Sequence, residues 1–348
     1  MKSILVTGGC GFIGSNFIKF ILQKNSQLNI INLDNLTYAG RGSNLSSVIK
    51  DRYVFIKGDI CNKDLVSSLF KKYKFDSVIH FAAESHVDRS IDGPEKFVNT
   101  NIVGTLNLLE HSRKHFMKSK NTSFRFLHIS TDEVFGTLSD IGKFTEETPY
   151  DPSSPYSASK AGSDHLVRAW NKTYGLPTLI TNCSNNYGPY QFPEKLIPLM
   201  IINAINDKPL PVYGTGKNIR DWLYVLDHCD AILTVLGKGK IGQTYNIGGG
   251  NEIKNLEVVK MICNVLDRLL PKKNSDSYEG LISFVKDRPG HDFRYAIDAT
   301  KINSKLGWYP KESFESGLEK TIKWYIENVD WCQSILKDKT IQKRLGVL

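Results

Sequence analysis

The chain has 348 residues and a formal net charge of +9, from 45 Lys and Arg against 36 Asp and Glu, and 41% of its residues are hydrophobic. This composition is close to the globular average, which excludes a disordered, collagen-like or coiled-coil chain, and the length predicts two domains. The basic residues are scattered, without the interleaved aromatic residues or zinc-ligand spacing of a nucleic-acid module, so we expect no nucleic-acid partner.

The first half of the chain alternates short strand-like runs with segments of helical periodicity. Strands are predicted at residues 4–6, 29–33, 53–56, 77–81, 124–129 and 178–182, and helices at residues 12–22, 63–73, 94–115 and 156–174. Such alternation is typical of an α/β protein with a doubly wound parallel sheet of the Rossmann type.

Beyond Asn185 the sequence becomes rich in Pro, Gly and aromatic residues, which predicts a smaller, loop-rich substrate-binding lobe. A strand predicted at 244–247 rejoins the first sheet, so this C-terminal lobe is discontinuous, and helices are predicted at 256–270 and 314–328. We therefore assign residues 1–184, rejoined by about 222–250, to the Rossmann domain, and residues 185–221 and 251–348 mainly to the second lobe.

Glycines follow the first predicted strand at a spacing of three and open a helix. Gly8, Gly11 and Gly14 allow a tight turn and close approach of the backbone to a pyrophosphate at the positive end of the helix. Asp34 ends the second strand 20 residues later, where a carboxylate can bind the adenosine ribose and repel a 2′-phosphate, so NAD is favoured over NADP. Asp59 has two equal interpretations, contact with the adenine edge or termination of the third strand.

Tyr156 and Lys160 lie four residues apart at the start of a predicted helix and therefore share one face. The ammonium, with the charge of a nicotinamide ring nearby, is expected to lower the pKa of the phenol toward neutrality, so that Tyr156 becomes a base, and to hold the cofactor ribose. YxxxK alone arises often by chance. After the glycine motif it identifies the chain as a member of the short-chain dehydrogenase/reductase family.

Thr131, Asp132 and Glu133 follow the fifth predicted strand, where many members of that family have only a hydroxyl residue. Both acids can reach one cleft only if the chain has already turned out of the strand, which Gly136 favours. If a sugar C4 hydroxyl is oxidised, the C5 hydrogen becomes acidic. Glu133 can then remove it while a protonated Asp132 gives a proton to the departing C6 hydroxyl, and Thr131 orients the C4 oxygen. Burial beside Glu133 is expected to keep Asp132 protonated.

Long segments throughout the chain resemble the dTDP-glucose 4,6-dehydratase family of nucleotide-sugar enzymes. They are TGGCGFIGSNF, LDNLTYAG, FAAESHVDRS, TNIVGT, STDEVFG, SSPYSASKAGSDHLVRAW, TNCSNNYGPYQFPEKLIPL, IRDWLYV, YNIGG and DRPGHDFRYAID. The resemblance implies an NAD-dependent hydro-lyase that acts on dTDP-glucose for deoxysugar (dTDP-rhamnose) biosynthesis. It also implies a homodimer built on the helices at 94–115 and 156–174, and no metal.

The expected NAD-binding residues are Gly8, Gly11, Phe12, Ile13, Gly14, Asp34, Asn35, Thr37, Asp59, Ile60, Ala82, Ala83, Thr100, Tyr156, Lys160 and Asn186. By the same resemblance, the substrate-binding residues are Ser85, His86, Thr131, Asn185, Glu194, Lys195, Leu196, Pro211, Tyr213, Arg220, Asn255, Arg288, His291 and Tyr295. Three of these residues also have a purely structural interpretation. Arg220 can pair with Asp221, Tyr213 can belong to the core, and His291 can belong to a loop.

Two positions depart from the family pattern: Phe135 replaces the usual tyrosine of TDEVYG, and Arg41-Gly42 replace asparagine and leucine. The competing hypotheses are a UDP-glucose 4,6-dehydratase, a nucleotide-sugar 4-epimerase, which needs no acids like Asp132 and Glu133, and a non-catalytic dinucleotide sensor.

The six cysteines are far apart and form no CxxC pair, no apolar run is long enough to span a membrane, and the N-terminus does not resemble a signal peptide. A cytoplasmic protein is therefore expected.

Overall fold

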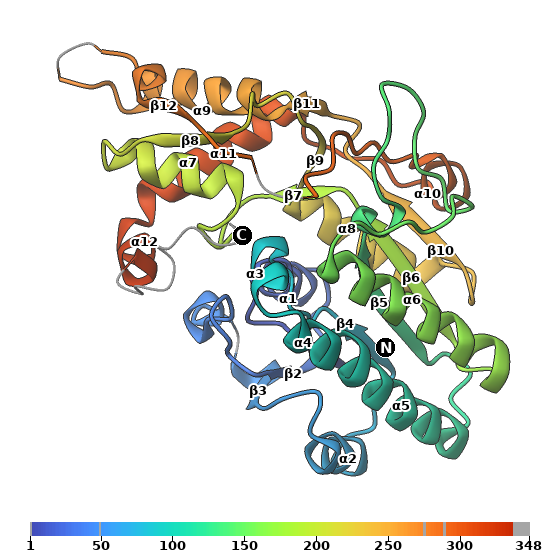
Figure 1. The fold of residues 1–348 in the computed structure, drawn as a ribbon. Helices are drawn as coiled ribbons and strands as arrows, with labels where there is room; N and C mark the ends of the chain where they lie inside the picture. The colour runs from blue at the N-terminus through green and yellow to red at the C-terminus, as the bar shows by residue number, and fades with distance from the viewer. Residues whose placement is uncertain (1, 49, 274–275, 288–289, 337–348) are drawn as a thin grey trace.

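The computed structural model describes residues 2–48, 50–273, 276–287 and 290–336 (Figure 1). A seven-stranded, fully parallel sheet has the order β10-β6-β5-β4-β1-β2-β3. Its strands are β1 (Ser3–Thr7), β2 (Asn29–Asp34), β3 (Tyr53–Lys57), β4 (Ser77–His80), β5 (Arg125–Thr131), β6 (Thr178–Cys183) and β10 (Thr244–Ile247). The predicted Rossmann-type fold class is confirmed.

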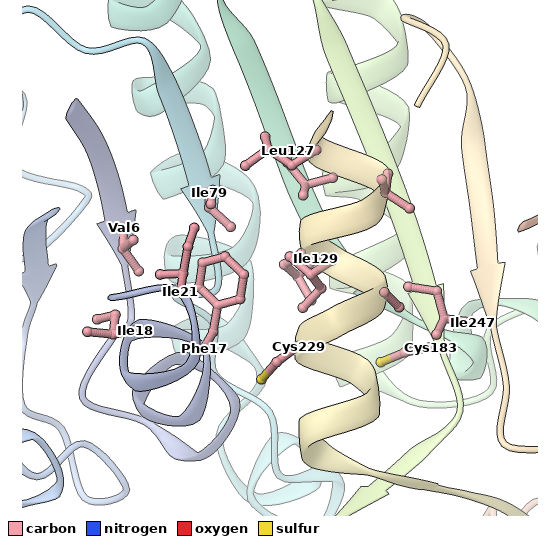
Figure 2. Packing of buried hydrophobic residues seen from close by; sticks show 14 of the residues in the cluster. Val6, Phe17, Ile18, Ile21, Ile79, Leu127, Ile129, Cys183, Cys229 and Ile247 are labelled. Carbon is pink, nitrogen blue, oxygen red and sulfur yellow. The ribbon is translucent and has the colours of Figure 1, made fainter. Parts of the chain in front are cut away.

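Helices cover both faces of this sheet. Apolar side chains of α1 (Phe12–Lys24) and α8 (Val225–Lys238) pack on one face, where Phe17 and Ile21 meet Ile79 and Cys229 lies near Ile129 (Figure 2). On the other face α2 (Lys63–Lys72), α5 (Thr105–Ser119) and α6 (Pro155–Tyr174) form a second apolar cluster. Because parallel strands are buried on both sides, they consist mostly of consecutive apolar residues.

The helix predicted at 94–115 is present but contains a π-helical segment. The structure has α4 (Pro94–Phe97), a π-helical segment η3 (Val98–Gly104) and then α5. Within η3 the buried Asn101 side chain accepts a hydrogen bond from Glu84 N at 2.9 Å and donates to Glu84 O at 3.0 Å and to Ser159 Oγ at 2.8 Å. Helical periodicity does not reveal this wider turn, in which Asn101 makes three tertiary hydrogen bonds. Turns of the π type are frequent at functional sites.

The C-terminal lobe has its own apolar core. One small sheet has the order β11-β9-β7 and a two-stranded sheet pairs β12 with β8. These strands are β7 (Asn185–Tyr187), β8 (Leu210–Tyr213), β9 (Ile219–Tyr224), β11 (Glu252–Lys254) and β12 (Ile282–Val285), and the helices around them are α7 (Leu196–Ile205), α9 (Asn255–Leu269), α11 (Phe314–Glu327) and α12 (Val329–Leu336).

The predicted return of the chain to the first sheet agrees with the positions of α8 and β10. In addition, α10 (Thr300–Leu306) packs its Ile302 and Leu306 into the core of the first sheet. The short elements are α3 (Val87–Asp92) and the 3-10 turns η1 (Gly42–Leu45), η2 (Lys50–Arg52), η4 (Asp132–Phe135) and η5 (Tyr278–Leu281). The exact domain boundaries remain a prediction.

Candidate active site

A cavity of about 620 Å³ opens at the carboxyl ends of the central strands. Clefts in this position are the usual ligand sites of open parallel sheets. All of the residues expected to bind NAD line it, from Gly8 in the first turn to Asn186 after β6. The expected catalytic residues and part of the expected substrate site also line it: Thr131, Asp132, Glu133, Tyr156, Lys160, Ser85, Asn185, Glu194 and Lys195.

The glycine turn between β1 and α1 forms one wall of the cavity. Gly8 has φ +72°, and a Cβ atom there would lie 2.5 Å from Ala82 N. A Cβ atom on Gly14 would lie 2.4 Å from Gly8 O. The first turn of α1 contains no acidic residue, so its amide groups present uncompensated positive potential. The backbone cradle and its charge therefore fit a pyrophosphate.

Asp34 ends β2 at the next wall. Its Oδ2 accepts a hydrogen bond from Cys10 N at 2.8 Å and its Oδ1 accepts one from Leu36 N at 2.8 Å. Burial raises the pKa of this carboxyl group, and the two backbone hydrogen bonds oppose that rise. Each carboxylate oxygen can accept a further bond, so the carboxyl that shapes the turn still fits a ribose diol.

Asp59 has the structural role that the sequence analysis left open, at the end of the third strand. Its Oδ1 accepts a hydrogen bond from Cys61 N at 2.8 Å, and its Oδ2 accepts one from Asn35 Nδ2 at 3.2 Å. The residue thus holds the turn after β3. It also lines the cavity, so contact with the adenine edge remains a prediction.

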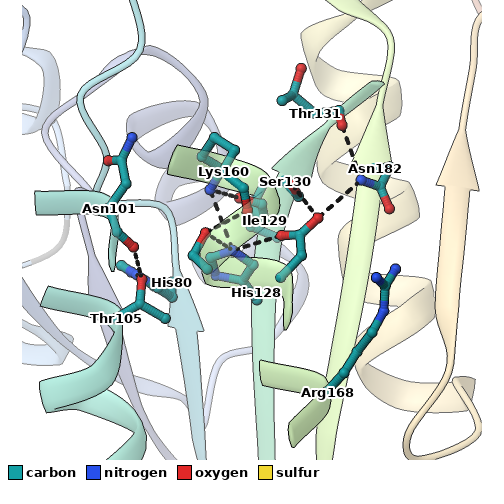
Figure 3. A network of polar contacts seen from close by, with 12 residues as sticks. His80, Asn101, Thr105, His128, Ile129, Ser130, Thr131, Lys160, Arg168 and Asn182 are labelled. Atoms are coloured by element: carbon teal, nitrogen blue, oxygen red, sulfur yellow. Dashed lines mark hydrogen bonds and ion pairs between the residues drawn. The ribbon is translucent and has the colours of Figure 1, made fainter. Parts of the chain in front are cut away.

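Tyr156 and Lys160 enter the cavity because α6 begins at a defined point. Ser154 caps the helix through a reciprocal capping box with Ser157, and Pro155 occupies the first turn. Tyr156 and Lys160 are both buried. Lys160 Nζ donates to Ile129 O at 2.8 Å and lies 3.4 Å from His128 Nε2 (Figure 3).

The expected lowering of the Tyr156 pKa includes the charge of a bound nicotinamide ring and stays a prediction, but the surroundings of the phenol in the protein alone act in the opposite direction. Burial, followed by the charge of Glu133, raises the pKa of this phenol well above its usual value, while a hydrogen bond with Thr131 acts in the opposite direction. The ammonium group of Lys160, one turn later on α6, donates to a backbone carbonyl of β5.

The two acids lie where the chain leaves β5, as the sequence predicted. Thr131 caps the turn η4 by accepting a hydrogen bond from Glu133 N at 3.3 Å, and Gly136 has φ +84°. Asp132 is buried, and its Oδ2 has no hydrogen-bond partner among the described residues. Burial, then the charge of Glu133, raises the pKa of Asp132 well above its usual value. The expected direction is confirmed, and Asp132 is a suitable proton donor.

The substrate side of the cavity contains contacts that the sequence analysis missed. Glu194 accepts a hydrogen bond from Arg89 Nε at 3.1 Å, and the Arg89 guanidinium lies 3.9 Å from the ring centre of Tyr38. Lys195 Nζ donates to Ser85 O at 3.1 Å. These contacts join segments up to 110 residues apart, and only the quoted family segments indicated that the residues matter.

Other cavity residues were also missed, among them Glu84, Ser130, Cys183, Ser184, Gln191 and Phe192. Buried oxygen atoms of Ser184, Asn185 and Gln191 have no hydrogen-bond partner among the described residues. Buried polar groups are almost always satisfied. These atoms therefore indicate a wall that meets a polar ligand.

The remaining expected substrate residues lie outside this cavity: His86, Leu196, Pro211, Tyr213, Arg220, Asn255, His291 and Tyr295. Arg288 lies outside the described residues. The structure brings Tyr213 and His291 together, with ring centres 6.1 Å apart, and Tyr213 OH donates to Asp88 Oδ2 at 3.4 Å. Leu196 begins α7 and contacts the apolar core of the C-terminal lobe.

Arg220 is buried against Tyr295, with its guanidinium 4.3 Å from the ring centre. It donates to Asp292 O at 2.9 Å and to Ile219 O at 2.8 Å. Its neighbour Asp221 instead accepts a hydrogen bond from Asn251 N at 2.9 Å, as expected when successive strand residues face opposite ways. The role of Arg220 toward a phosphate remains a prediction.

In the described parts of the chain, no cluster of three or more His, Cys, Asp or Glu side chains is arranged to hold a metal ion. Nor does any helix of those parts have the length and apolar character needed to cross a membrane.

Comparison with known proteins agrees with the geometry. A family model described as GDP-mannose 4,6 dehydratase matches residues 5–321. The dTDP-glucose 4,6-dehydratase of Neisseria meningitidis is 56% identical, over 99% of each chain. The solved dTDP-glucose 4,6-dehydratase of Streptomyces venezuelae, with NAD and dTDP bound, has a TM-score of 0.88 and 44% identity over 96% of this chain and 99% of that one. The solved enzyme of Bacillus anthracis, in complex with NAD, has a TM-score of 0.85 and 47% identity over 96% and 100%. The chain therefore belongs to the dTDP-glucose 4,6-dehydratase family.

Proposed function

We propose that this chain is an NAD-dependent hydro-lyase that converts dTDP-glucose into dTDP-4-keto-6-deoxyglucose. The observation that carries the proposal is the pair Asp132 and Glu133, which line the same cavity as Tyr156. Asp132 is buried with a raised pKa, so two neighbouring acids differ in their environment. Such a difference is what a paired acid and base require.

NAD is the cofactor of the proposed reaction. The glycine turn would hold its pyrophosphate, Asp34 its adenosine ribose, and Lys160 its nicotinamide ribose. When bound, NAD supplies a positively charged ring and a reversible hydride acceptor, so that oxidation at C4 and reduction at C6 balance within one substrate molecule.

Tyr156 and Thr131 act at the C4 hydroxyl. Thr131 orients the C4 oxygen, and Tyr156 takes the hydroxyl proton. Because burial and the negative charge of Glu133 raise the pKa of Tyr156 in the protein alone, the phenolate requires added positive charge. Lys160, one turn later on α6, provides an ammonium group on the same helix face.

Glu133 and Asp132 carry out the elimination. Glu133 takes the proton from C5, next to the new C4 ketone, and the electron pair of that bond forms the C5–C6 double bond. The C6–O bond breaks, and Asp132 gives its proton to the departing hydroxyl, so one water leaves; when C6 is reduced, Glu133 returns the proton to C5. Asp132 begins the cycle protonated because burial beside Glu133 disfavours its charged form.

Two other activities remain alternatives. A UDP-glucose 4,6-dehydratase has the same sugar chemistry and differs only in the nucleotide pocket. A nucleotide-sugar 4-epimerase uses the cofactor, Tyr156 and Lys160 but does not need the acid pair. The names of the full-length relatives favour the dTDP-glucose enzyme.

The test is incubation of the NAD-saturated protein with dTDP-glucose and, in parallel, with UDP-glucose. We expect dTDP-glucose to give a product lighter by one water, without net NADH, and deuterium placed on C4 to appear on C6. Mass spectrometry measures both. A product of unchanged mass with the galactose configuration would indicate an epimerase, and faster dehydration of UDP-glucose would overturn the nucleotide assignment.

The assembly, pathway and location follow as further parts of the proposal. A homodimer through η3, α5 and α6 is supported by exposed apolar side chains on the first two elements, Val98, Leu106 and Met117. The product would enter deoxysugar biosynthesis, such as that of dTDP-rhamnose, in the cytoplasm. Residues 1–184 with about 222–250 would bind NAD, and the second lobe would bind the nucleotide sugar.

A further inference from the structure

A buried polar network surrounds Lys160 between α6 and β5 (Figure 3). Lys160 Nζ donates to Ile129 O at 2.8 Å and lies 3.4 Å from His128 Nε2. The lysine is only 4% exposed. An ammonium group removed from water to this extent needs a compensating negative charge to remain protonated.

Asp164 lies one turn after Lys160 on the same face of α6, and its side chain is fully buried. Its Oδ2 accepts hydrogen bonds from Ser130 Oγ and Tyr150 OH, each at 2.8 Å. Its Oδ1 lies 3.2 Å from His128 Nε2. A carboxyl group with several donors is stabilised as the carboxylate. Although burial acts to raise it, the pKa of Asp164 is lowered by His128, Lys160 and Tyr150.

The other titratable groups that interact electrostatically with Lys160 come from the three strands beneath it. They are His80 on β4, His128 on β5 and Cys183 on β6. Burial, assisted by Lys160, lowers the pKa of His128 to about 4. Burial also lowers the pKa of His80 and raises that of Cys183, so all three are neutral near pH 7. Among these described groups, Asp164 is the one that carries negative charge.

A second cation lies further along the same face of α6. Arg168 Nη2 donates to Tyr150 OH at 2.7 Å, and Tyr150 donates to Asp164. The carboxylate therefore lies between two positive side chains, one turn before it and one turn after it. This arrangement explains how a full negative charge is retained in the core.

We propose that Asp164 is a positioning residue, whose buried carboxylate keeps Lys160 protonated and oriented at the cavity wall. Asp164 is not among the residues that line the cavity. It therefore acts through Lys160. The part of this inference that concerns catalysis rests on the proposed function, whereas the protonation of Lys160 does not.

The direct test follows the titration of Lys160 by NMR in the full-length chain labelled with ¹³C at the lysine ε carbons. The signal is assigned by its loss in Lys160→Met. Burial lowers the pKa of Lys160 to about 8, and Asp164 opposes this effect. We expect Asp164→Asn to lower the titration midpoint by about one pH unit or more, since a nearby opposite charge shifts a pKa by roughly 1–3 units.

Tyr150→Phe is the matched control, because it removes a buried hydrogen bond to the same oxygen of Asp164 but leaves the charge. Its midpoint should stay within about 0.3 units of the wild type, even if thermal unfolding shows an equal loss of stability. Asp164→Ser, a smaller neutral substitution, replaces Asp164→Asn if that variant does not fold. A midpoint unchanged by neutral substitution at Asp164 would overturn the inference.

The pH dependence of dehydration is the second measurement. Lys160 must be charged, so activity falls as pH rises through its pKa, and in Asp164→Asn this alkaline limb should move down by the same amount as the NMR midpoint. If the wild type does not dehydrate dTDP-glucose, the proposed function fails while the NMR result still decides the role of Asp164. If the wild type is active and the limb of Asp164→Asn does not move, the catalytic part of the inference is refuted.

Discussion

Replacement of Asp132 by asparagine should reduce activity and increase stability at neutral pH. Asp132 is 2% exposed, and its pKa is raised well above the usual value by burial and by the charge of Glu133. At pH values between the unfolded and the folded pKa, the folded state therefore holds a proton that the unfolded chain has lost. Asparagine has nearly the same shape but carries no transferable proton, so it separates the two effects.

The sign of the stability change follows from proton linkage. A group with a raised folded-state pKa contributes stability below its unfolded pKa of about 3.9, and this contribution is lost as pH rises through the folded value. The loss is about 1.4 kcal/mol for each pH unit between the two pKa values. For a chain of this length that corresponds to roughly 2 °C in Tm per unit. The free energy of unfolding of Asp132→Asn should not decrease in this way, because asparagine does not titrate.

The assay compares thermal unfolding of the wild type and Asp132→Asn at pH 4 and at pH 7.5. The two proteins should have similar Tm values at pH 4, and the variant should be more stable at pH 7.5. Glu133→Gln is a second probe of the same effect, because the charge of Glu133 is one cause of the raised pKa of Asp132, and its removal should reduce the loss of stability between the two pH values. Dehydration by Asp132→Asn should fall by about 10² to 10⁴ in kcat, the usual contribution of a general acid. A Tm difference between variant and wild type that does not grow with pH would refute the assignment of a neutral buried carboxyl group.

Two further predictions test other parts of the cavity. Glu133→Gln should oxidise the sugar at C4 and then stop before elimination, so that absorbance at the wavelength of NADH appears and persists; complete dehydration by this variant would contradict its role as the base at C5. Gly14→Ala should weaken NAD binding strongly in a fluorescence titration, because the added Cβ atom would lie 2.4 Å from Gly8 O and must displace the glycine turn. Gly42→Ala is the control and should bind NAD like the wild type, because a Cβ atom at that position meets nothing within 4 Å.

Local sequence patterns were sufficient for much of the cavity. The spacing of Gly8, Gly11 and Gly14 determines a turn that leads from β1 into α1. The spacing of Tyr156 and Lys160 determines that both lie on one face of α6. In these cases the relevant contacts lie within one or two turns of chain, so the order of the residues is enough to predict them.

Other properties depend on distant contacts. The sequence predicted that Lys160 and a nicotinamide ring lower the pKa of Tyr156, but it did not show that the fold buries this phenol near Glu133 or directs Lys160 to Ile129 O. It predicted a helix at 94–115 but not the π-helical segment within it, where Asn101 bonds to Glu84. Neither effect can be found from periodicity, because each depends on atoms that only folding brings near.

The sequence by itself therefore determined the order of strands and helices, the glycine turn, and which acids and bases leave the sheet at the same edge. Only the tertiary structure decided how burial shifts the pKa of Tyr156 and Lys160 and which partners hold the site, such as Asp164 beside His128 and Arg89 beside Glu194. The physical reason is that proton affinity depends on burial and on nearby charge. Burial and nearby charge depend on residues from the whole fold and not on a local run of sequence.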